Sequence, residues 1–177
     1  MIFAETELKG VFIVEVDKLV DARGFFARVW CEQELRGQDL NPRIAQCSIS
    51  FNHKRGTLRG MHYQVAPHEE AKLVRCTAGA IYDVVLDLRS DSPTYTRWIA
   101  VELTALNRRM MYIPEGCAHG FQTLEDETEV LYLISQVYDA ASARGVRWND
   151  PAFSIEWPAA NRTLSDRDRT YPDFVRT

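Results

Sequence analysis

The feature that most constrains the fold is a succession of short β-branched and aromatic stretches, most of them separated by short polar or glycine-containing turns. Strands that recur at roughly 8–12-residue spacing are typical of antiparallel sandwiches and barrels. Helical patterns are expected only at 32–38 and around 164–170. The predicted strands are 10–16, 24–30, 45–51, 57–64, 72–78, 80–88, 96–103, 108–114, 118–124 and 129–138. The sequence therefore predicts an all-β fold with short peripheral helices.

The chain length favours one domain. With 177 residues, 46% of them hydrophobic, the chain can bury a substantial core. No low-complexity segment, internal repeat or Gly/Ser linker divides it, so we expect a single domain over 1–177. No apolar run approaches the ~18–20 residues of a transmembrane helix. The first residues lack the basic and apolar regions of a signal peptide, so a cytoplasmic protein without membrane contact is expected.

Charge and cysteine content exclude some partners. The net charge of −4 gives no broad basic excess, which argues against nucleic-acid binding but allows a small anionic ligand held by a few arginines. The cysteines form no CxxC pair, which argues against a zinc knuckle or a redox motif. Free thiols, kept reduced in the cytosol, are the simpler interpretation. They are Cys31, Cys47, Cys76 and Cys117.

Alternation along two predicted strands separates their faces. In 80–88, Asp83 shares a face with Ile81 and Val85. In 129–138, Tyr132 shares a face with the β-branched Val130 and Ile134. We therefore expect Tyr132 to point inward, toward a core or a barrel lumen.

The stretch RGMHYQ (59–64) concentrates polar chemistry on one predicted strand. In a regular strand Arg59 and His62 point to opposite faces, unless Gly60 carries a bulge that redirects one of them. The pattern leaves both arrangements open. An inward His62 is either a hydrogen-bonded core histidine or a general base or ligand.

Two further polar residues allow both a structural and a functional interpretation. Lys72 begins a strand beside apolar residues and is either a surface lysine or part of a site. His119 follows a Pro-Glu-Gly turn and either stabilises that turn or belongs to a crowded site. Two histidines on separate strands could bind a metal, but a metal site normally needs three or four ligands. The His-x-His pair of metal-binding barrels is broken here by Gln64, so no metal is expected.

Seven motifs in order resemble the dTDP-4-dehydrorhamnose 3,5-epimerase family of cupin-fold enzymes. The resemblance runs over about residues 5–172, and the ordered set is far more specific than any single motif. The motifs are DARGFF (21–26), GTLRGMHYQ (56–64), KLVR (72–75), DVVLDLR (83–89), IPEGCAHGF (113–121), RGVRWNDP (144–151) and LSDRD (164–168).

The resemblance implies a cupin-type antiparallel β-barrel (jelly roll) and an isomerase. The implied substrate is dTDP-4-keto-6-deoxyglucose, a nucleotide sugar on the route to L-rhamnose in polysaccharide biosynthesis. Its C3 and C5 flank the C4 ketone, so their protons are acidified by enolate formation. Epimerisation needs a base, an acid on the opposite face and a stabiliser of the enolate oxygen. Because the ketone is already present, no cofactor and no metal are implied.

The resemblance also assigns catalytic residues. His62 matches the base, and Asp168 matches the carboxylate that orients it. Tyr132 matches the acid, and Lys72 matches the cation near the C4 oxygen. His119 matches a second active-site histidine that contacts the sugar.

Substrate-binding residues and a homodimer follow from the same resemblance. Arg59 and Arg23 match arginines that hold the pyrophosphate, for which the planar guanidinium is well suited. Phe26 and Gln46 match nucleotide contacts, and Tyr138 matches a tyrosine on the sugar side. In the family, the residues that match Arg23 and Phe26 reach the partner's site, so a homodimer with an arm contributing to the partner's site is implied.

Three positions depart from the family's pattern. Arg28 stands where an acid often helps to recognise the base, which puts the thymine preference in doubt. Ser48 stands where asparagine is frequent and could change contacts with the nucleotide or the sugar. Leu133 replaces a lysine after the catalytic tyrosine, on the face away from it, so little effect on catalysis is expected.

Other functions remain open at this point. One is an epimerase acting at C3 alone, at C5 alone, or on another nucleotide-linked 4-keto sugar. Another is a metal-dependent cupin, against which the missing His-x-His pair counts. A third is a non-catalytic sugar-nucleotide binding module, which would have no need of an acid and a base on opposite faces.

Overall fold

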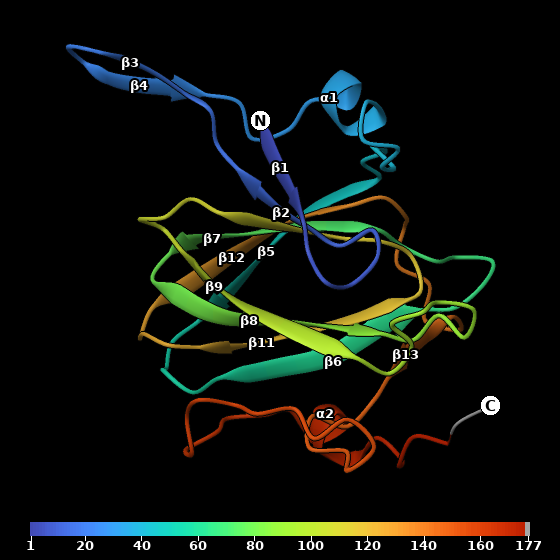
Figure 1. Cartoon of the computed structure of the whole chain (residues 1–177). Coiled ribbons are helices and arrows are strands. Elements are labelled where there is room, and N and C mark those ends of the chain that lie inside the picture. The colour runs from blue at the N-terminus through green and yellow to red at the C-terminus, as the bar shows by residue number, and fades with distance from the viewer. Residues whose placement is uncertain (176–177) are drawn as a thin grey trace.

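Two antiparallel sheets lie face to face in the structure, a computed structural model that describes residues 1–175 (Figure 1). The first sheet has the strand order β1-β2-β10-β7-β12-β5, and the second has the order β13-β6-β11-β8-β9. Neither sheet closes on itself among the described residues, so the architecture is an open, cupin-like jelly roll. The predicted all-β fold class is confirmed.

The strand bounds follow the predicted segments closely. The first sheet contains β1 (Ile2–Glu5), β2 (Phe12–Glu15), β5 (Gln46–Asn52), β7 (Lys72–Ala78), β10 (Met110–Ile113) and β12 (Thr128–Ile134). The second contains β6 (Leu58–Gln64), β8 (Ala80–Asp87), β9 (Trp98–Thr104), β11 (Cys117–Thr123) and β13 (Ala143–Gly145). The sequence did not predict β1 or β13.

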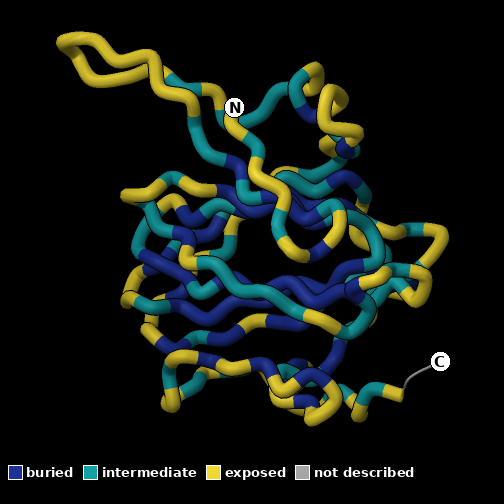
Figure 2. The backbone as a smooth tube through the Cα atoms, in the orientation of Figure 1, coloured by how far each residue is buried: buried dark blue, intermediate teal, exposed yellow. Residues whose placement is uncertain are grey.

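A third, two-stranded sheet forms an arm. β3 (Lys18–Asp21) pairs with β4 (Gly24–Ala27) and with no other strand of the described chain. This hairpin projects away from the body (Figure 1), and its surface is almost entirely exposed (Figure 2). The predicted strand 24–30 is therefore half of an arm, and its partner strand β3 was not predicted.

Two short helices lie at opposite sides of the sandwich. α1 (Glu32–Arg36) lies near the first sheet, and α2 (Asp166–Thr170) lies beneath the second (Figure 1). Both are shorter than the predicted 32–38 and 164–170. α1 ends before Gly37, and the Ser165 side chain begins α2 by accepting a hydrogen bond from the backbone N–H of Asp168. No helix within residues 1–175 is long and apolar enough to cross a membrane.

Three apolar clusters hold these layers together. The central cluster fills the sandwich with inward residues of both sheets, among them Val74, Val130, Ile81, Val85 and Phe121. A second cluster packs the outer face of the five-stranded sheet against the C-terminal segment, through Val146, Phe153, Ile155 and Trp157. A third packs the first sheet under α1, through Leu35 and Leu40. Burial of each such side chain contributes about 1.5–3 kcal/mol to the stability of the fold. The clusters therefore hold the two sheets against each other, and hold the C-terminal segment and α1 against their outer faces.

The face assignments made from alternation agree with this packing. Ile81 and Val85 lie in the central cluster, whereas Val84 and Leu86 lie in the second cluster on the other face of β8. Tyr132 packs against the central cluster, as its inward alternation predicted.

Candidate active site

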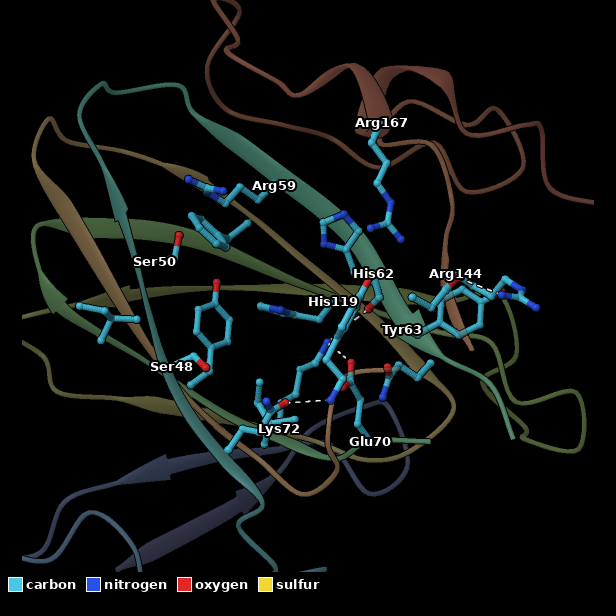
Figure 3. A pocket seen from close by; sticks show the side chains of 18 residues that line it. Ser48, Ser50, Arg59, His62, Tyr63, Glu70, Lys72, His119, Arg144 and Arg167 are labelled. Carbon is cyan, nitrogen blue, oxygen red and sulfur yellow. Dashed lines mark hydrogen bonds and ion pairs between the residues drawn. The ribbon is translucent and has the colours of Figure 1, made fainter. Parts of the chain in front are cut away.

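One cavity opens between the two sheets and collects most of the polar residues that the sequence singled out. Its volume is about 330 Å³. Side chains reach it from β5 and β12 on one side, from β6 and β11 on the other, and from α2 at its edge (Figure 3). The predicted site residues that line it are Gln46, Arg59, His62, Lys72, His119, Tyr132 and Tyr138.

A bulge in β6 explains how Arg59 and His62 come to share this cavity. His62 pairs with His119 and Arg59 pairs with Phe121, so three steps along β6 oppose two steps along β11. The extra residue shifts the side-chain alternation by one position, and the two polar side chains reach the same face. The regular strand considered from the sequence is therefore wrong at this point, and the bulge at Gly60 is correct.

Glycines on both strands permit the close approach at this bulge. Gly60 has φ +126°, and a Cβ there would lie 2.5 Å from the Cα of Gly120. A Cβ on Gly120 would lie 2.7 Å from the sulfur of Met61 and 2.8 Å from the carbonyl oxygen of Arg59. Side chains at either position would push β6 away from β11. The glycines thus set the positions of Arg59, His62 and His119.

His62 is paired with a buried carboxylate. Its Nε2 lies 2.6 Å from Oδ1 of Asp168, which α2 presents with only 4% of its surface exposed. Burial raises the pKa of Asp168, but hydrogen bonds from His62, from Ser165 and from the Gly60 backbone outweigh it and hold the pKa below its ordinary value. An ionised Asp168 accepts Nε2–H, which leaves Nδ1 as the ring nitrogen able to take a proton.

A second histidine–carboxylate pair lies deeper in the cavity. Nε2 of His119 is 2.7 Å from Oδ1 of Asp83, and both side chains are almost fully buried. The other carboxylate oxygen of Asp83 is buried without a hydrogen-bond partner. The ring of His119 meets that of Tyr132 edge-on, with centroids 6.0 Å apart. The pair therefore fixes His119 against the tyrosine.

Tyr132 enters the cavity from β12, in the sheet opposite to that of His62. Burial, followed by the nearby charge of Asp83, raises the pKa of its phenol above the ordinary value. The phenol is thus protonated at neutral pH and can donate a proton or a hydrogen bond.

Lys72 is buried at one end of the cavity, contrary to the surface position that a lysine usually takes. Its Nζ lies 2.8 Å from Oε1 of Glu70 and 3.5 Å from the carbonyl oxygen of His62. Figure 3 shows Lys72 and Glu70 together, on the opposite side of His119 from Arg59 and Arg167. The cavity therefore carries an ion pair at one end and arginines at the other.

The arginine end is held by neighbouring polar groups. Arg59 donates from Nε to Oδ1 of Asn52 at 2.8 Å, and the amide of the buried Asn52 is anchored on the Thr128 carbonyl at 3.1 Å. The Tyr138 hydroxyl, beside Arg167, helps to raise the pKa of that guanidinium. Gln46 accepts from the backbone N–H of Tyr138 at 2.9 Å, which joins β5 to the loop after β12.

Three predicted site residues do not line this cavity: Asp168, which lies behind His62, and the two residues of the arm. Arg23 and Phe26 are on the exposed β3–β4 arm, where Arg23 is paired with Asp21. Phe26 retains 69% of its surface exposure. Arg28, at the base of the arm, is paired with Glu34 at 3.0 Å. Within one chain, none of the three lines the cavity.

Several residues at the site were not predicted. Asp83 carried a detectable signal, because its alternation placed an acid on a buried face. No alternation pattern marked the other four. Asn52 is the last residue of β5, and Glu70 lies in the loop before β7. Arg144 lies in the three-residue strand β13, and Arg167 lies in the short helix α2. Within residues 1–175, no group of three or more His, Cys, Asp or Glu side chains is placed to hold a metal ion.

Comparison with known proteins decides the family. The family model described as dTDP-4-dehydrorhamnose 3,5-epimerase matches residues 5–176. The chain belongs to this family. It is 40% identical to the dTDP-4-dehydrorhamnose 3,5-epimerase of Shigella flexneri, over 97% of this chain and 94% of the relative.

Two further relatives of the family bear on the site. A crystal structure of dTDP-4-dehydrorhamnose 3,5-epimerase from Bacillus anthracis, with TDP and PPi bound, matches with a TM-score of 0.92 and 38% identity, covering 97% of this chain and 98% of that one. The dTDP-4-dehydrorhamnose 3-epimerase of Streptomyces niveus is 39% identical, over 92% of this chain and 78% of the relative. The family thus includes an enzyme named for both carbons and one named for C3 alone.

Proposed function

We propose that this protein epimerises C3 and C5 of dTDP-4-keto-6-deoxyglucose and so supplies a precursor of L-rhamnose. The observation that carries the proposal is the placement of a carboxylate-paired histidine and a protonated tyrosine on opposite sheets, facing one cavity. A sugar ring held between them would meet a base on one face and an acid on the other. That is what inversion at a carbon next to a ketone requires.

His62 is the proposed base and Asp168 its partner. Nδ1 of His62 would take the proton from C5 or C3, and the electron pair of the C–H bond would move onto the C4 oxygen as an enolate. Asp168, 2.6 Å from Nε2, would keep the ring in the correct tautomer and stabilise the imidazolium that forms. A base of this kind typically contributes 10²–10⁴-fold to the rate.

Tyr132 and Lys72 would complete the proton transfer. The ammonium of Lys72 would stabilise the negative charge on the C4 oxygen of the enolate. The phenol of Tyr132 would then give its proton to the carbon from the opposite face, which inverts the configuration. His62 would lose its proton to solvent and Tyr132 would regain one, so that the same groups could serve the second carbon. His119, held by Asp83, would contact a sugar hydroxyl.

The nucleotide would lie toward the arginine end. The guanidinium of Arg59 is oriented by Asn52 and suits a pyrophosphate oxygen. Gln46 and Tyr138 would contact the nucleotide and the sugar from the same side. Arg28 is paired with Glu34 and does not line the cavity of its own chain, so any contact of Arg28 with a base would be made in the partner's site.

We infer that the protein acts as a homodimer whose arm contributes to the partner's site. The β3–β4 arm presents Leu19, Val20 and Phe26 to solvent, at 67%, 75% and 69% exposure, and the outer β5 strand presents Ile49 at 63%. Apolar surface of this extent on a projecting hairpin is typical of an interaction surface. A second copy of the chain would cover it and bring Arg23 and Phe26 to the partner's cavity.

We also infer that residues 1–177 work as one domain in the cytoplasm. The C-terminal segment covers the second sheet and brings Asp168 to His62 of β6, which ties this segment to the site. The four cysteines are free thiols, which suits a reducing compartment.

A second candidate function is epimerisation at one carbon alone. The observation in its favour is the relative from Streptomyces niveus, named as a 3-epimerase. Both reactions use a base and an acid, so the residues described above do not separate them. Counting the carbon-bound protons that exchange with solvent does.

His62→Ala tests the proposed chemistry. We expect loss of solvent exchange at both C3 and C5, by about 10²–10⁴-fold, because one base serves both carbons. The readout is proton NMR of dTDP-4-keto-6-deoxyglucose in deuterated water. His53→Ala, which removes an exposed histidine outside the cavity, is the matched control and should exchange at the wild-type rate. Retained exchange at either carbon in His62→Ala would contradict the single-base proposal.

A further inference from the structure

The cavity contains a carboxylate that the proposed chemistry does not use. Glu70 lines it, with 11% of its side chain exposed, and its Oε1 lies 2.8 Å from Nζ of Lys72. Removing two charged groups from water is costly and is offset only by good geometry. A carboxylate in a cavity that would receive an anionic pyrophosphate also repels the ligand. The presence of a carboxylate at this position therefore indicates a role that offsets these costs.

The distribution of charge suggests where Glu70 acts. Arg59 and Arg167 lie on the side of the cavity opposite to Glu70 and Lys72 (Figure 3). The pyrophosphate would bind near the arginines, away from the carboxylate. The sugar ring would then lie at the end where Glu70 and Lys72 meet, so Glu70 acts on the sugar end of the site.

The ammonium of Lys72 has to be held in place by hydrogen-bond acceptors if it is to contact the C4 oxygen of the sugar. Its ammonium ends a flexible four-carbon chain with considerable rotamer freedom. The structure offers two anchors, the Glu70 carboxylate at 2.8 Å and the long contact to the His62 carbonyl oxygen at 3.5 Å. An ammonium has three N–H donors, so two anchors leave one donor for the substrate.

We propose that Glu70 is a positioning residue, which holds the Lys72 ammonium where the C4 oxygen of the sugar becomes an enolate. This inference rests on the proposed function and adds to it the residue that aims the cation. Glu70 need not touch the substrate. It acts by fixing the geometry in which the third donor of Lys72 points into the cavity.

The charge of Glu70 and the position of its acceptor oxygen have opposite effects on how well Lys72 stabilises the enolate, so variants can distinguish the two. The negative charge weakens the field of the ammonium at the enolate, whereas the hydrogen-bond acceptor fixes where the ammonium lies. Glu70→Gln keeps an acceptor oxygen at the same reach and removes the charge. Glu70→Ala removes both, and Glu70→Asp keeps the charge but withdraws it by one methylene.

The experiment compares initial rates of proton exchange at C3 and C5 of dTDP-4-keto-6-deoxyglucose for these three variants. We expect kcat to fall on the order of 100-fold for Glu70→Ala, since a displacement of about 1 Å can cost that much. Glu70→Asp should fall in the same direction, and Glu70→Gln should stay within about threefold of wild type. KM and the affinity for dTDP alone should change little in all three, because the arginine end is intact. Glu69→Ala, an exposed neighbour that does not line the cavity, is the matched control.

Two results would overturn the inference while leaving the proposed function standing. One is a Glu70→Ala enzyme with wild-type kcat, which would show that Lys72 needs no such anchor. The other is a Glu70→Gln enzyme as slow as Glu70→Ala, which would show that charge and not position matters. Absence of exchange in the wild-type protein would instead overturn the proposed function and the inference together. If Glu70→Ala fails to fold, Glu70→Asp decides the question: wild-type kcat in that variant would overturn the inference, and a lowered kcat beside a near wild-type Glu70→Gln would support it.

Discussion

Single side chains in the cavity owe their chemistry to one buried partner each. Asp168 orients His62, Asp83 orients His119, and Asn52 orients Arg59. In the proposed mechanism, such partners would fix the ring tautomer or the direction of a guanidinium before the substrate binds, which would lower the cost of organising the transition state. Tyr132 differs, because a phenol of ordinary pKa, about 10, is already protonated at neutral pH and burial raises that pKa further.

Tyr132→Phe tests the role of the acid. The variant removes the phenol hydroxyl and keeps the ring that packs on His119, so the fold should be unchanged. We expect proton removal by His62 to persist in part, while net inversion is reduced on the order of 100-fold. Deuterium uptake measured beside coupled reduction of the product separates the two steps. Full epimerisation by this variant would mean that the acid is another group.

At the residue scale, alternation along one strand predicted a side-chain direction, whereas geometry that depends on a neighbouring strand stayed open. Tyr132 was placed inward by alternation alone. The convergence of Arg59 and His62 depended on a bulge whose position is set by Gly120 on another strand, and one strand's sequence does not reveal it. Glu70 was not predicted because it lies in a loop, where the sequence has no periodicity that would indicate the direction of the side chain.

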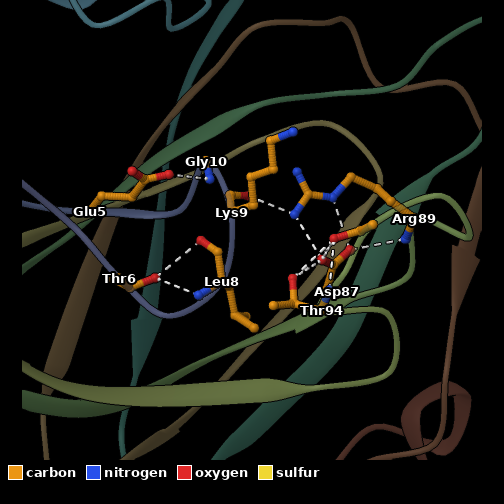
Figure 4. Close-up of polar contacts among 9 residues, drawn as sticks. Glu5, Thr6, Leu8, Lys9, Gly10, Asp87, Arg89 and Thr94 are labelled. Atoms are coloured by element: carbon orange, nitrogen blue, oxygen red, sulfur yellow. Dashed lines mark hydrogen bonds and ion pairs between the residues drawn. The ribbon is translucent and has the colours of Figure 1, made fainter.

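At the level of elements, a hydrogen-bond network around Asp87 joins the end of β8, the connection between β8 and β9, and the loop between β1 and β2. Asp87 is fully buried and accepts hydrogen bonds from Arg89, Ser92 and Thr94. Arg89 also donates to the Lys9 carbonyl oxygen at 2.7 Å, which ties the loop between β1 and β2 to the connection between β8 and β9 (Figure 4). Burial raises the pKa of Asp87, but these hydrogen bonds outweigh it and lower the pKa to about 2.

Asp87→Asn should therefore destabilise the protein in a pH-dependent way. Because the folded-state pKa lies below the ordinary 3.8, the carboxylate stabilises the fold above about pH 4, and this contribution is lost as the pH falls toward about 2. The contribution is on the order of 2 kcal/mol at neutral pH. Urea unfolding at several pH values measures it, with Asp91→Asn, an exposed acid of the same loop, as control. A stability difference between wild type and Asp87→Asn that is the same at pH 7 and pH 2.5 would contradict this account.

Elements with dense β-branched composition were predicted well, and sparse ones were not. The long central strands β7, β8 and β12 alternate clearly between two buried faces. The missed strands β1, β3 and β13 are three or four residues long and lie at a sheet edge or in the arm. Their extended conformation comes from pairing with a neighbouring strand, and a local pattern of that length carries little information.

At the level of the whole molecule, the β3–β4 arm has no role in the cavity of its own chain. It extends from the body (Figure 1) and carries Arg23 and Phe26, two residues that the family resemblance assigns to a binding site. Inside one chain they lie outside the cavity. A partner that receives the arm would complete the site, and a sequence alone specifies no partner geometry.

Mixing two inactive variants tests whether the arm acts in the partner's site. Arg23→Ala combined with Phe26→Ala should impair nucleotide-sugar binding, and His62→Ala should abolish catalysis. If the arm acts across the dimer, dissociating and reassociating the two variants together gives mixed dimers with one complete site, and about a quarter of wild-type activity returns on statistical grounds. Each variant reassociated with itself is the control. Mixed dimers without any recovered activity would show that the arm serves its own chain.

Proton NMR of the wild-type protein with dTDP-4-keto-6-deoxyglucose in deuterated water shows whether the protein exchanges the protons at both C3 and C5. We expect the H3 and H5 signals both to disappear, and the product to be consumed when a reductase is coupled to the reaction. Loss of one signal alone would make the protein a single-site epimerase. Retention of both signals would contradict the assignment of His62 and Tyr132 as base and acid for this sugar.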